Sequence, residues 1–182
     1  MSDFDSPWKE ALERFLPMFL EFFFPEIYAD VDWSRGWESL DKELQQVVHE
    51  AEMGPRLADK LFRVWRRDGL EAWVLIHIEV QNQPDEGFAE RMYVYNYRLY
   101  DRFRRAIVSL AVLGDARDAW RPAHFGYELW GCKISLDFPV VKLLDYAQDL
   151  TALEAAANPF GLVVLAHLQT AATARDQQSR KD

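Results

Sequence analysis

The chain has 182 residues, the length of one ordinary domain. Hydrophobic residues make up 49% and aromatic residues 14%, which supplies a real core and excludes a wholly disordered chain. The formal net charge of −9 excludes a protein that coats nucleic acid through a broad basic surface. A nuclease stays compatible with this charge, because metal ions neutralise a carboxylate site locally.

The single cysteine, Cys132, excludes an internal disulfide, and we interpret it as a core residue in a reducing, cytoplasmic protein. The acidic N-terminus does not resemble a secretory signal. The apolar run 15–24 contains Pro17 and Glu21 and has about half the length needed to cross a bilayer. We therefore expect no membrane contact and predict a buried, aromatic-rich helix there.

In the first third of the chain, the sequence patterns predict helices that precede the first clear strands. Apolar residues at helical spacing predict a helix over 7–24, which Pro25 ends or interrupts. Residues 25–36 continue as a short helix or an irregular loop. Residues 37–50 are ambiguous and fit a short strand followed by a helical turn.

The clearest sheet signal follows, in two segments joined by a turn. Residues 58–66 alternate between two faces, one with Leu61 and Trp65 and the other with Phe62 and Val64. Asp68-Gly69 is typical of a hairpin turn. Residues 72–81 are too apolar for a one-sided sheet, so we predict a central strand covered on both faces.

The remaining segments alternate between helix and strand, so we predict one mixed α/β domain over 1–175 and a polar C-terminal tail over 176–182. The expected elements are an amphipathic helix over 88–104, strands over 107–113, 127–134 and 140–146, and helices over 151–157 and 158–174.

Three polar side chains of the hairpin form a candidate site. Glu79 and Gln81 project to the same face of a strand, because side chains alternate. Asp59 joins that face only if the hairpin loop has an odd number of residues or a bulge. A three-residue loop over 67–69 would pair Arg66 with Leu70 and set Asp59 opposite His77; a strict two-residue turn would put Asp59 on the other face.

This arrangement of side chains suits metal-dependent hydrolysis of a phosphodiester. Two carboxylates on adjacent strands, Asp59 and Glu79, can bind a hard cation such as Mg²⁺ or Mn²⁺, with the carbonyl oxygen of Val80 as a further ligand. The metal generates hydroxide near neutral pH and stabilises the transition state. A polar residue two positions after the second carboxylate, Gln81, can orient the attacking water.

The same residues resemble the PD-(D/E)XK nucleases, and several segments resemble the transposase-like branch that includes the recombination-promoting nucleases. The segments are ADKLFRVWRRDG, AWVLIHIEVQNQ, ERMYVYNYRLYDRF, VSLAVLGD and FGYELWGCKISLDFPVVKLLDY, within about residues 15–170. The resemblance implies a restriction-endonuclease-like α/β core, a mixed central sheet flanked by helices. It also implies a Mg²⁺-dependent endonuclease that cuts double-stranded DNA in transposition or recombination.

Further roles come from the resemblance alone. In this branch, Gln often occupies the motif position at which other PD-(D/E)XK nucleases have Lys, and Gln81 follows that pattern. Similar nucleases use an acid from the first helical region, here Glu43 with Asp41 as second candidate, and Arg91 and Tyr95 would bind phosphate. Such nucleases often act as dimers, so the resemblance also implies a homodimer. Members of this branch extend further, so we expect a short version that keeps the nuclease core.

Two other functions stay open from the sequence. An inactive nuclease fold could bind DNA or a protein, and the acidic charge and the absent lysine favour this reading. The same site could also cleave RNA. We interpret His77 as a core residue and the arginines at 98–105 as a solvated face.

Overall fold

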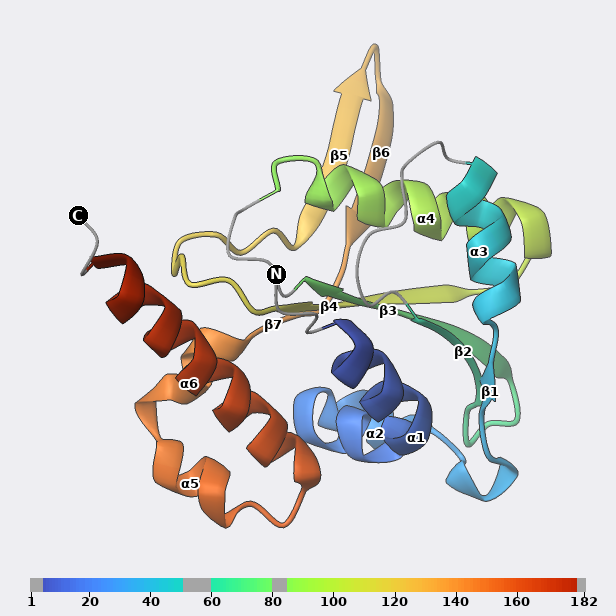
Figure 1. The fold of residues 1–182 in the computed structure, drawn as a ribbon. Coiled ribbons are helices and arrows are strands. Elements are labelled where there is room, and N and C mark those ends of the chain that lie inside the picture. The colour runs from blue at the N-terminus through green and yellow to red at the C-terminus, as the bar shows by residue number, and fades with distance from the viewer. Residues whose placement is uncertain (1–4, 51–59, 80–84, 180–182) are drawn as a thin grey trace.

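A mixed five-stranded sheet forms the centre of the computed structural model, which describes residues 5–50, 60–79 and 85–179 (Figure 1). The strand order is β1-β2-β3-β4-β7, in which β1, β2 and β3 are antiparallel neighbours and β3, β4 and β7 are parallel. The strands span Glu38–Ser39 (β1), Lys60–Trp65 (β2), Glu71–Glu79 (β3), Ile107–Leu113 (β4) and Val140–Lys142 (β7).

Helices cover both faces of this sheet (Figure 1). One face packs against α1 (Asp5–Phe23), α2 (Pro25–Asp30), α5 (Leu150–Ala155) and α6 (Pro159–Ser179). The other face packs against α3 (Asp41–Glu50) and α4 (Phe88–Phe103). Short 3₁₀ helices span Trp33–Arg35 (η1) and Leu143–Gln148 (η2). The predicted α/β fold is confirmed, and the arrangement is compatible with a restriction-endonuclease-like core.

The central strand β3 is buried on both sides, as its apolar sequence predicts. Val74 and Ile76 lie in the cluster with α1 and α6, whereas Trp73 and Leu75 lie in the cluster with α3 and α4. β3 pairs with β2 on one side and β4 on the other. The connection from β3 through α4 to β4 is the helical crossover that two parallel strands require.

The loop between β2 and β3 has three residues and keeps the register that an odd loop predicts. The Arg66 N–H donates to the Leu70 carbonyl oxygen at 2.8 Å, and the Gly69 N–H donates to the Arg66 carbonyl oxygen at 2.9 Å. Gly69 has φ +85°, a left-handed conformation that glycine adopts without a steric cost. Trp65 pairs with Glu71 and Lys60 with Ile76, so the structure has the odd loop that the candidate site requires and not the two-residue turn.

The prediction of one strand over 127–134 is wrong. Two antiparallel strands, β5 (His124–Leu129) and β6 (Cys132–Asp137), form a separate hairpin. Trp130 and Gly131 between them both have positive φ, as a two-residue hairpin turn requires, and this turn interrupts an alternation that reads as continuous in sequence. Cys132 lies exposed beside the turn, so its interpretation as a core residue is also wrong.

Two further boundaries differ from the sequence prediction. The strand expected over 140–146 ends at Lys142 and continues as η2. The last helix begins at Pro159 and runs to Ser179, beyond the expected end at residue 174 and into the expected tail. Among the described helices, none has both the length and the apolar character needed to cross a membrane.

Candidate functional site

The carboxyl ends of three parallel strands meet at one edge of the sheet, where open α/β sheets commonly place their sites. Glu79 ends β3 and pairs with Leu113 of β4, and Leu113 pairs with Lys142 of β7. Neighbouring strands lie about 4.8 Å apart, so the backbones at positions 79 and 142 are about 10 Å apart. This edge is the candidate site.

The predicted catalytic and metal-binding residues lie at this edge or outside the described residues. The structure describes the backbone of Glu79 as the end of β3. Asp59, Val80 and Gln81 fall outside the described residues. Within residues 5–50, 60–79 and 85–179, no three His, Cys, Asp or Glu side chains are grouped as metal ligands. The site formed by Asp59, Glu79 and Gln81, with Val80 as a metal ligand, therefore stays a prediction.

Of the two acids proposed for the first helical region, Asp41 is tied to strand β2. The Leu40 N–H donates to the Leu61 carbonyl oxygen at 2.7 Å, so α3 begins directly beside β2. Asp41 Oδ2 accepts a hydrogen bond from Lys60 Nζ at 2.5 Å, and Asp41 Oδ1 is buried without a hydrogen-bond partner among the described residues. Glu43 is half-buried in the first turn of α3.

Lys60 follows Asp59 in the chain and is a buried cation with two acidic partners. Its Nζ atom also lies 3.3 Å from Glu13 Oε2 of α1. Burial by itself lowers the pKa of Lys60, but the hydrogen bonds and charges of Asp41 and Glu13 outweigh it and raise the pKa above its ordinary value. Lys60 is therefore protonated at neutral pH.

Arg91 and Tyr95, the predicted phosphate-binding pair, both lie in the protein interior. Tyr95 is fully buried in the cluster that holds Leu75. The Arg91 side chain is 5% exposed, its Nη1 donates to Asp85 Oδ2, and its guanidinium lies 5.5 Å from the centre of the Phe88 ring. Phosphate binding by Arg91 stays a prediction, and it would require Asp85 to give up this contact.

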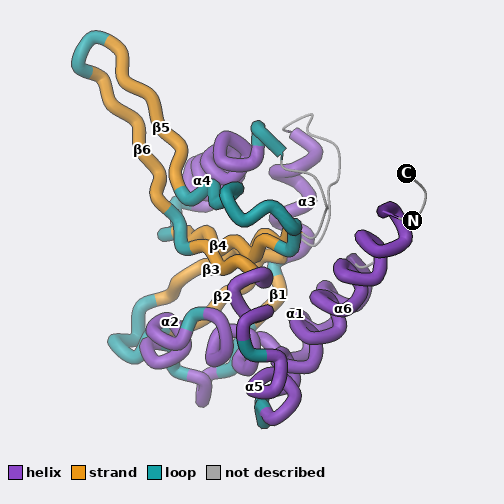
Figure 2. Tube along the Cα trace, turned by 90° about the vertical axis from the view of Figure 1, so that its left-hand side faces the viewer, coloured by secondary structure: helices purple, strands orange, loops and turns teal. Residues whose placement is uncertain are grey.

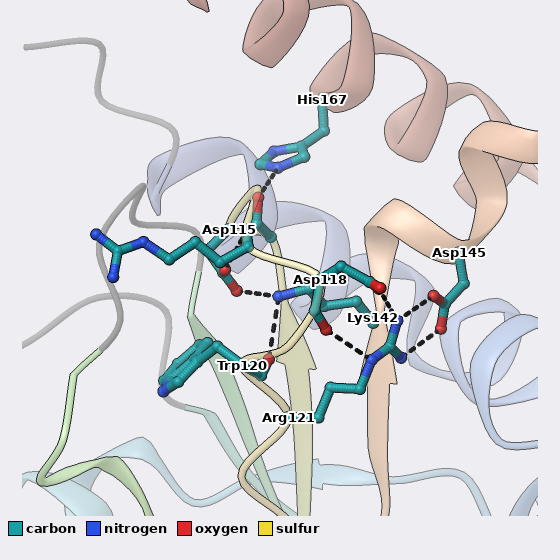
Figure 3. Close-up of polar contacts among 9 residues, drawn as sticks. Asp115, Asp118, Trp120, Arg121, Lys142, Asp145 and His167 are labelled. Atoms are coloured by element: carbon teal, nitrogen blue, oxygen red, sulfur yellow. Dashed lines mark hydrogen bonds and ion pairs between the residues drawn. The ribbon is translucent and has the colours of Figure 1, made fainter.

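A buried ion pair between Asp115 and Lys142 occupies the β4–β7 side of the edge (Figure 3). Both side chains are 0% exposed. Lys142 Nζ also donates to the Trp120 carbonyl oxygen at 3.2 Å and lies 5.5 Å from the centre of the Trp120 ring. The pair links the loop after β4 to the end of β7 without contact with solvent.

Further hydrogen bonds hold the same loop. The Arg117 N–H donates to Asp115 Oδ1 at 2.8 Å, and His167 Nε2 of α6 lies 2.8 Å from the Gly114 carbonyl oxygen (Figure 3). Arg121 donates to both Asp118 and Asp145. The hydrogen bond from Arg121 lowers the pKa of Asp145 below its ordinary value.

Sequence reasoning missed Asp115 and Lys142. The available signals were a lysine within the apolar run 140–144 and an aspartate directly after the buried strand that ends at Leu113. A charge in such a position is costly to bury unless it is paired, so each residue predicts a partner. The sequence does not say that the two residues are each other's partner.

The chain matches no known protein-family model, no curated protein and no solved structure.

Proposed function

We propose that this protein is a metal-dependent DNA endonuclease whose site lies at the carboxyl edge of β3. The observation that supports the proposal is the three-residue loop between β2 and β3. Extending the observed register by one residue would set Asp59 opposite His77 and diagonal to Glu79. Alternation along two paired strands then assigns positions 59, 77 and 79 to one face, as the site requires.

The donor set suits a hard divalent cation. The carboxylates of Asp59 and Glu79 and the carbonyl oxygen of Val80 would hold Mg²⁺ or Mn²⁺, whose preferred ligands are oxygens. Asp41 is a candidate third acid, because its buried Oδ1 atom accepts no hydrogen bond from the described residues. When bound, the cation supplies an activated water and positive charge at the scissile phosphate.

The remaining residues would position the substrate and water. Gln81 carries no charge, so it would orient the attacking water through its amide. Neither Lys60 nor Lys142 takes the role of the lysine in the PD-(D/E)XK motif, because each is paired with a buried or half-buried carboxylate. Double-stranded DNA as substrate, a role in transposition or recombination, and a cytoplasmic location follow from the resemblance and complete the proposal.

Plasmid nicking tests the proposal. In Mg²⁺ or Mn²⁺ the protein should convert supercoiled plasmid to the nicked form, and chelation should stop it. Asp59→Asn and Glu79→Gln should each lower the rate by about 10²-fold or more, as removal of transition-state charge stabilisation does. Calorimetry should show Mn²⁺ binding by the natural chain and weak or no binding by both variants.

Asp68→Asn is the matched control. It removes one carboxylate from the same hairpin at its opposite end, where Asp68 Oδ1 accepts from the Leu70 N–H. This variant should nick plasmid and bind Mn²⁺ at the natural level. A chain that binds no metal and cuts no plasmid would instead be an inactive binding module. Cleavage of structured RNA without plasmid nicking would overturn DNA as the substrate.

A further inference from the structure

The β5–β6 hairpin, residues 124–137, projects from the body of the molecule as an arm (Figures 1 and 2). Six residues per strand give it a length of about 20 Å. Its pairing register separates two chemically different faces. The apolar face carries Phe125, Tyr127, Leu129, Cys132, Ile134 and Leu136, and the polar face carries His124, Gly126, Glu128, Lys133, Ser135 and Asp137.

Aromatic rings connect the apolar face of the arm to helix α4. The Phe125 ring stacks on Tyr93 with centroids 5.0 Å apart, and Tyr93 stacks on Tyr97 at 6.1 Å. Tyr127 lies edge-on to Phe125 at 6.4 Å. One helical turn beyond Tyr97, Tyr100 shares its side of α4. The arm and α4 thus form one continuous apolar surface.

Much of this surface is open to solvent. The exposed fractions are 55% for Tyr127, 60% for Leu129, 50% for Tyr97 and 51% for Tyr100. Contiguous apolar patches of this kind mark interaction sites in soluble proteins. A two-stranded hairpin is also marginally stable by itself, so a partner on its apolar face would stabilise it.

The backbone conformation of Trp130, at the tip of the arm, is energetically unfavourable in the free chain. Its φ is +54°, a left-handed conformation that costs a residue other than glycine about 1–2 kcal/mol. The side chain is 97% exposed, so no packing within the chain offsets this cost. Residues held in such conformations are concentrated at functional sites. Burial of the indole ring by a partner would offset the strain.

The arm itself lacks the positive charge that a nucleic-acid site needs. The arm carries two acids, Glu128 and Asp137, and one base, Lys133. Binding to phosphates requires an excess of Lys and Arg. The rings of Phe125, Tyr93 and Tyr97 are also stacked on one another, so their faces are already partly covered. A protein surface is the better partner.

We propose that the occupant is the same surface of a second copy of this chain. The arm has a formal net charge of −1, and the segment 97–104 at the end of α4 that it would meet in the other copy carries Arg98, Arg102 and Arg104 against Asp101, so the two halves of the contact do not repel each other. An aromatic side chain buries about 150–250 Å², so the exposed parts of Trp130, Tyr127, Tyr97 and Tyr100 give roughly 500 Å² per copy. Two copies reach about 1,000 Å², the lower limit of a specific interface.

A two-fold axis makes this surface self-complementary. The two arms run antiparallel with their apolar faces in contact, so the tip of each arm, with Leu129 and Trp130, reaches the α4 tyrosines of the other copy. Because such a contact is isologous, each exposed ring is buried in both copies. The inference is independent of the proposed nuclease activity, because no residue of the β3 edge takes part.

The oligomeric state in solution tests the proposal. Sedimentation or light scattering should show the mass of two chains at protein concentrations from about 1 to 100 µM, the affinity range of an interface of this size. Leu129→Glu places a charge on the apolar face and should give a monomer with an unchanged circular dichroism spectrum. Ser135→Glu places the same charge on the polar face of the arm and should stay dimeric.

Trp130→Asn separates the fold of the arm from its association. Asn-Gly is the preferred pair for a turn with two positive φ values, so this variant should melt no lower than the natural chain under monomeric conditions. It should nevertheless dimerise at least tenfold more weakly, because the indole ring is lost. A purely structural role for Trp130 would lower the melting temperature instead.

Cys132, the only cysteine of the chain, reports on the same face without an engineered label. Its alkylation by a maleimide should slow as the concentration of the natural chain rises, and stay fast at all concentrations in Leu129→Glu. A natural chain that is monomeric at 100 µM, a rough upper bound for a specific contact, would overturn the proposal. So would a dimer unaffected by Leu129→Glu, or a loss of DNA binding in that variant without a change in mass.

Discussion

The ion pair between Lys142 and Asp115 shows how one residue can depend on another 27 positions away. Each charge is costly to bury alone, and their contact together with the Arg117 N–H and the Trp120 carbonyl satisfies both. The pair holds the loop after β4 against β7. We therefore interpret it as a structural support of the sheet edge.

Removal of one partner should be far more harmful than removal of both charges. Lys142→Met leaves Asp115 buried and unpaired, and we expect a loss of about 3–5 kcal/mol in the free energy of unfolding. Adding Asp115→Asn removes the second charge and keeps an oxygen that can accept from Arg117, so most of that loss should be recovered. Urea denaturation of both single variants and the double variant measures this coupling; additive losses would contradict it.

Lys60 predicts a specific dependence of stability on pH. Its folded pKa is raised above the ordinary value of about 10.5, so the stabilisation is complete below that pH and is lost as the pH rises through the folded pKa. Lys60→Met should cost about 1–3 kcal/mol at pH 7, the contribution of hydrogen bonds to a charged group. The difference from the natural chain should shrink above about pH 10.5.

Denaturation curves for both chains at neutral and alkaline pH measure this difference directly. Other lysines and tyrosines titrate in both chains, so they largely cancel in the comparison. Lys9→Met is a suitable control, because Lys9 lies only half-buried on α1. A difference between the natural chain and Lys60→Met that grows with pH would contradict the assignment.

At the scale of elements, the hairpin loop between β2 and β3 decides which residues share a face. The loop has an odd number of residues because Gly69 takes a left-handed conformation, which closes the turn after Arg67 and Asp68. A strict two-residue turn would move every side chain of β2 to the opposite face. Phe62 and Val64 would then leave the core that they share with α1.

Gly69→Ala should destabilise the protein through its backbone alone. An added Cβ atom would meet nothing within 4 Å, so the cost is the left-handed conformation, about 1–2 kcal/mol. Gly69→Asn should cost less, because asparagine tolerates this region better than alanine. Midpoints of urea denaturation distinguish the two variants. An equal or larger loss for Gly69→Asn would show that side-chain crowding matters there.

At the scale of the whole molecule, the acidic net charge is compatible with the proposed DNA substrate only if the site attracts phosphate locally. The net charge of −9 opposes general attraction to phosphates. In the proposed nuclease, a divalent cation at the carboxyl edge of β3 would reverse the sign of the potential there. The proposed dimer would place two such edges in one particle, an arrangement suited to cutting both strands of a duplex.

Local patterning in the sequence determined most elements, because burial imposes a period of two on strands and 3.6 on helices. It predicted the doubly covered strand β3 and helix α4, and it left the length of the hairpin loop open between an odd loop and a two-residue turn. Only the tertiary structure decided that Lys142 pairs with Asp115, that Asp41 holds Lys60, and that residues 124–137 form an exposed arm. Those outcomes depend on contacts between distant segments, and alternation alone does not distinguish a strand within the core from one that projects into solvent.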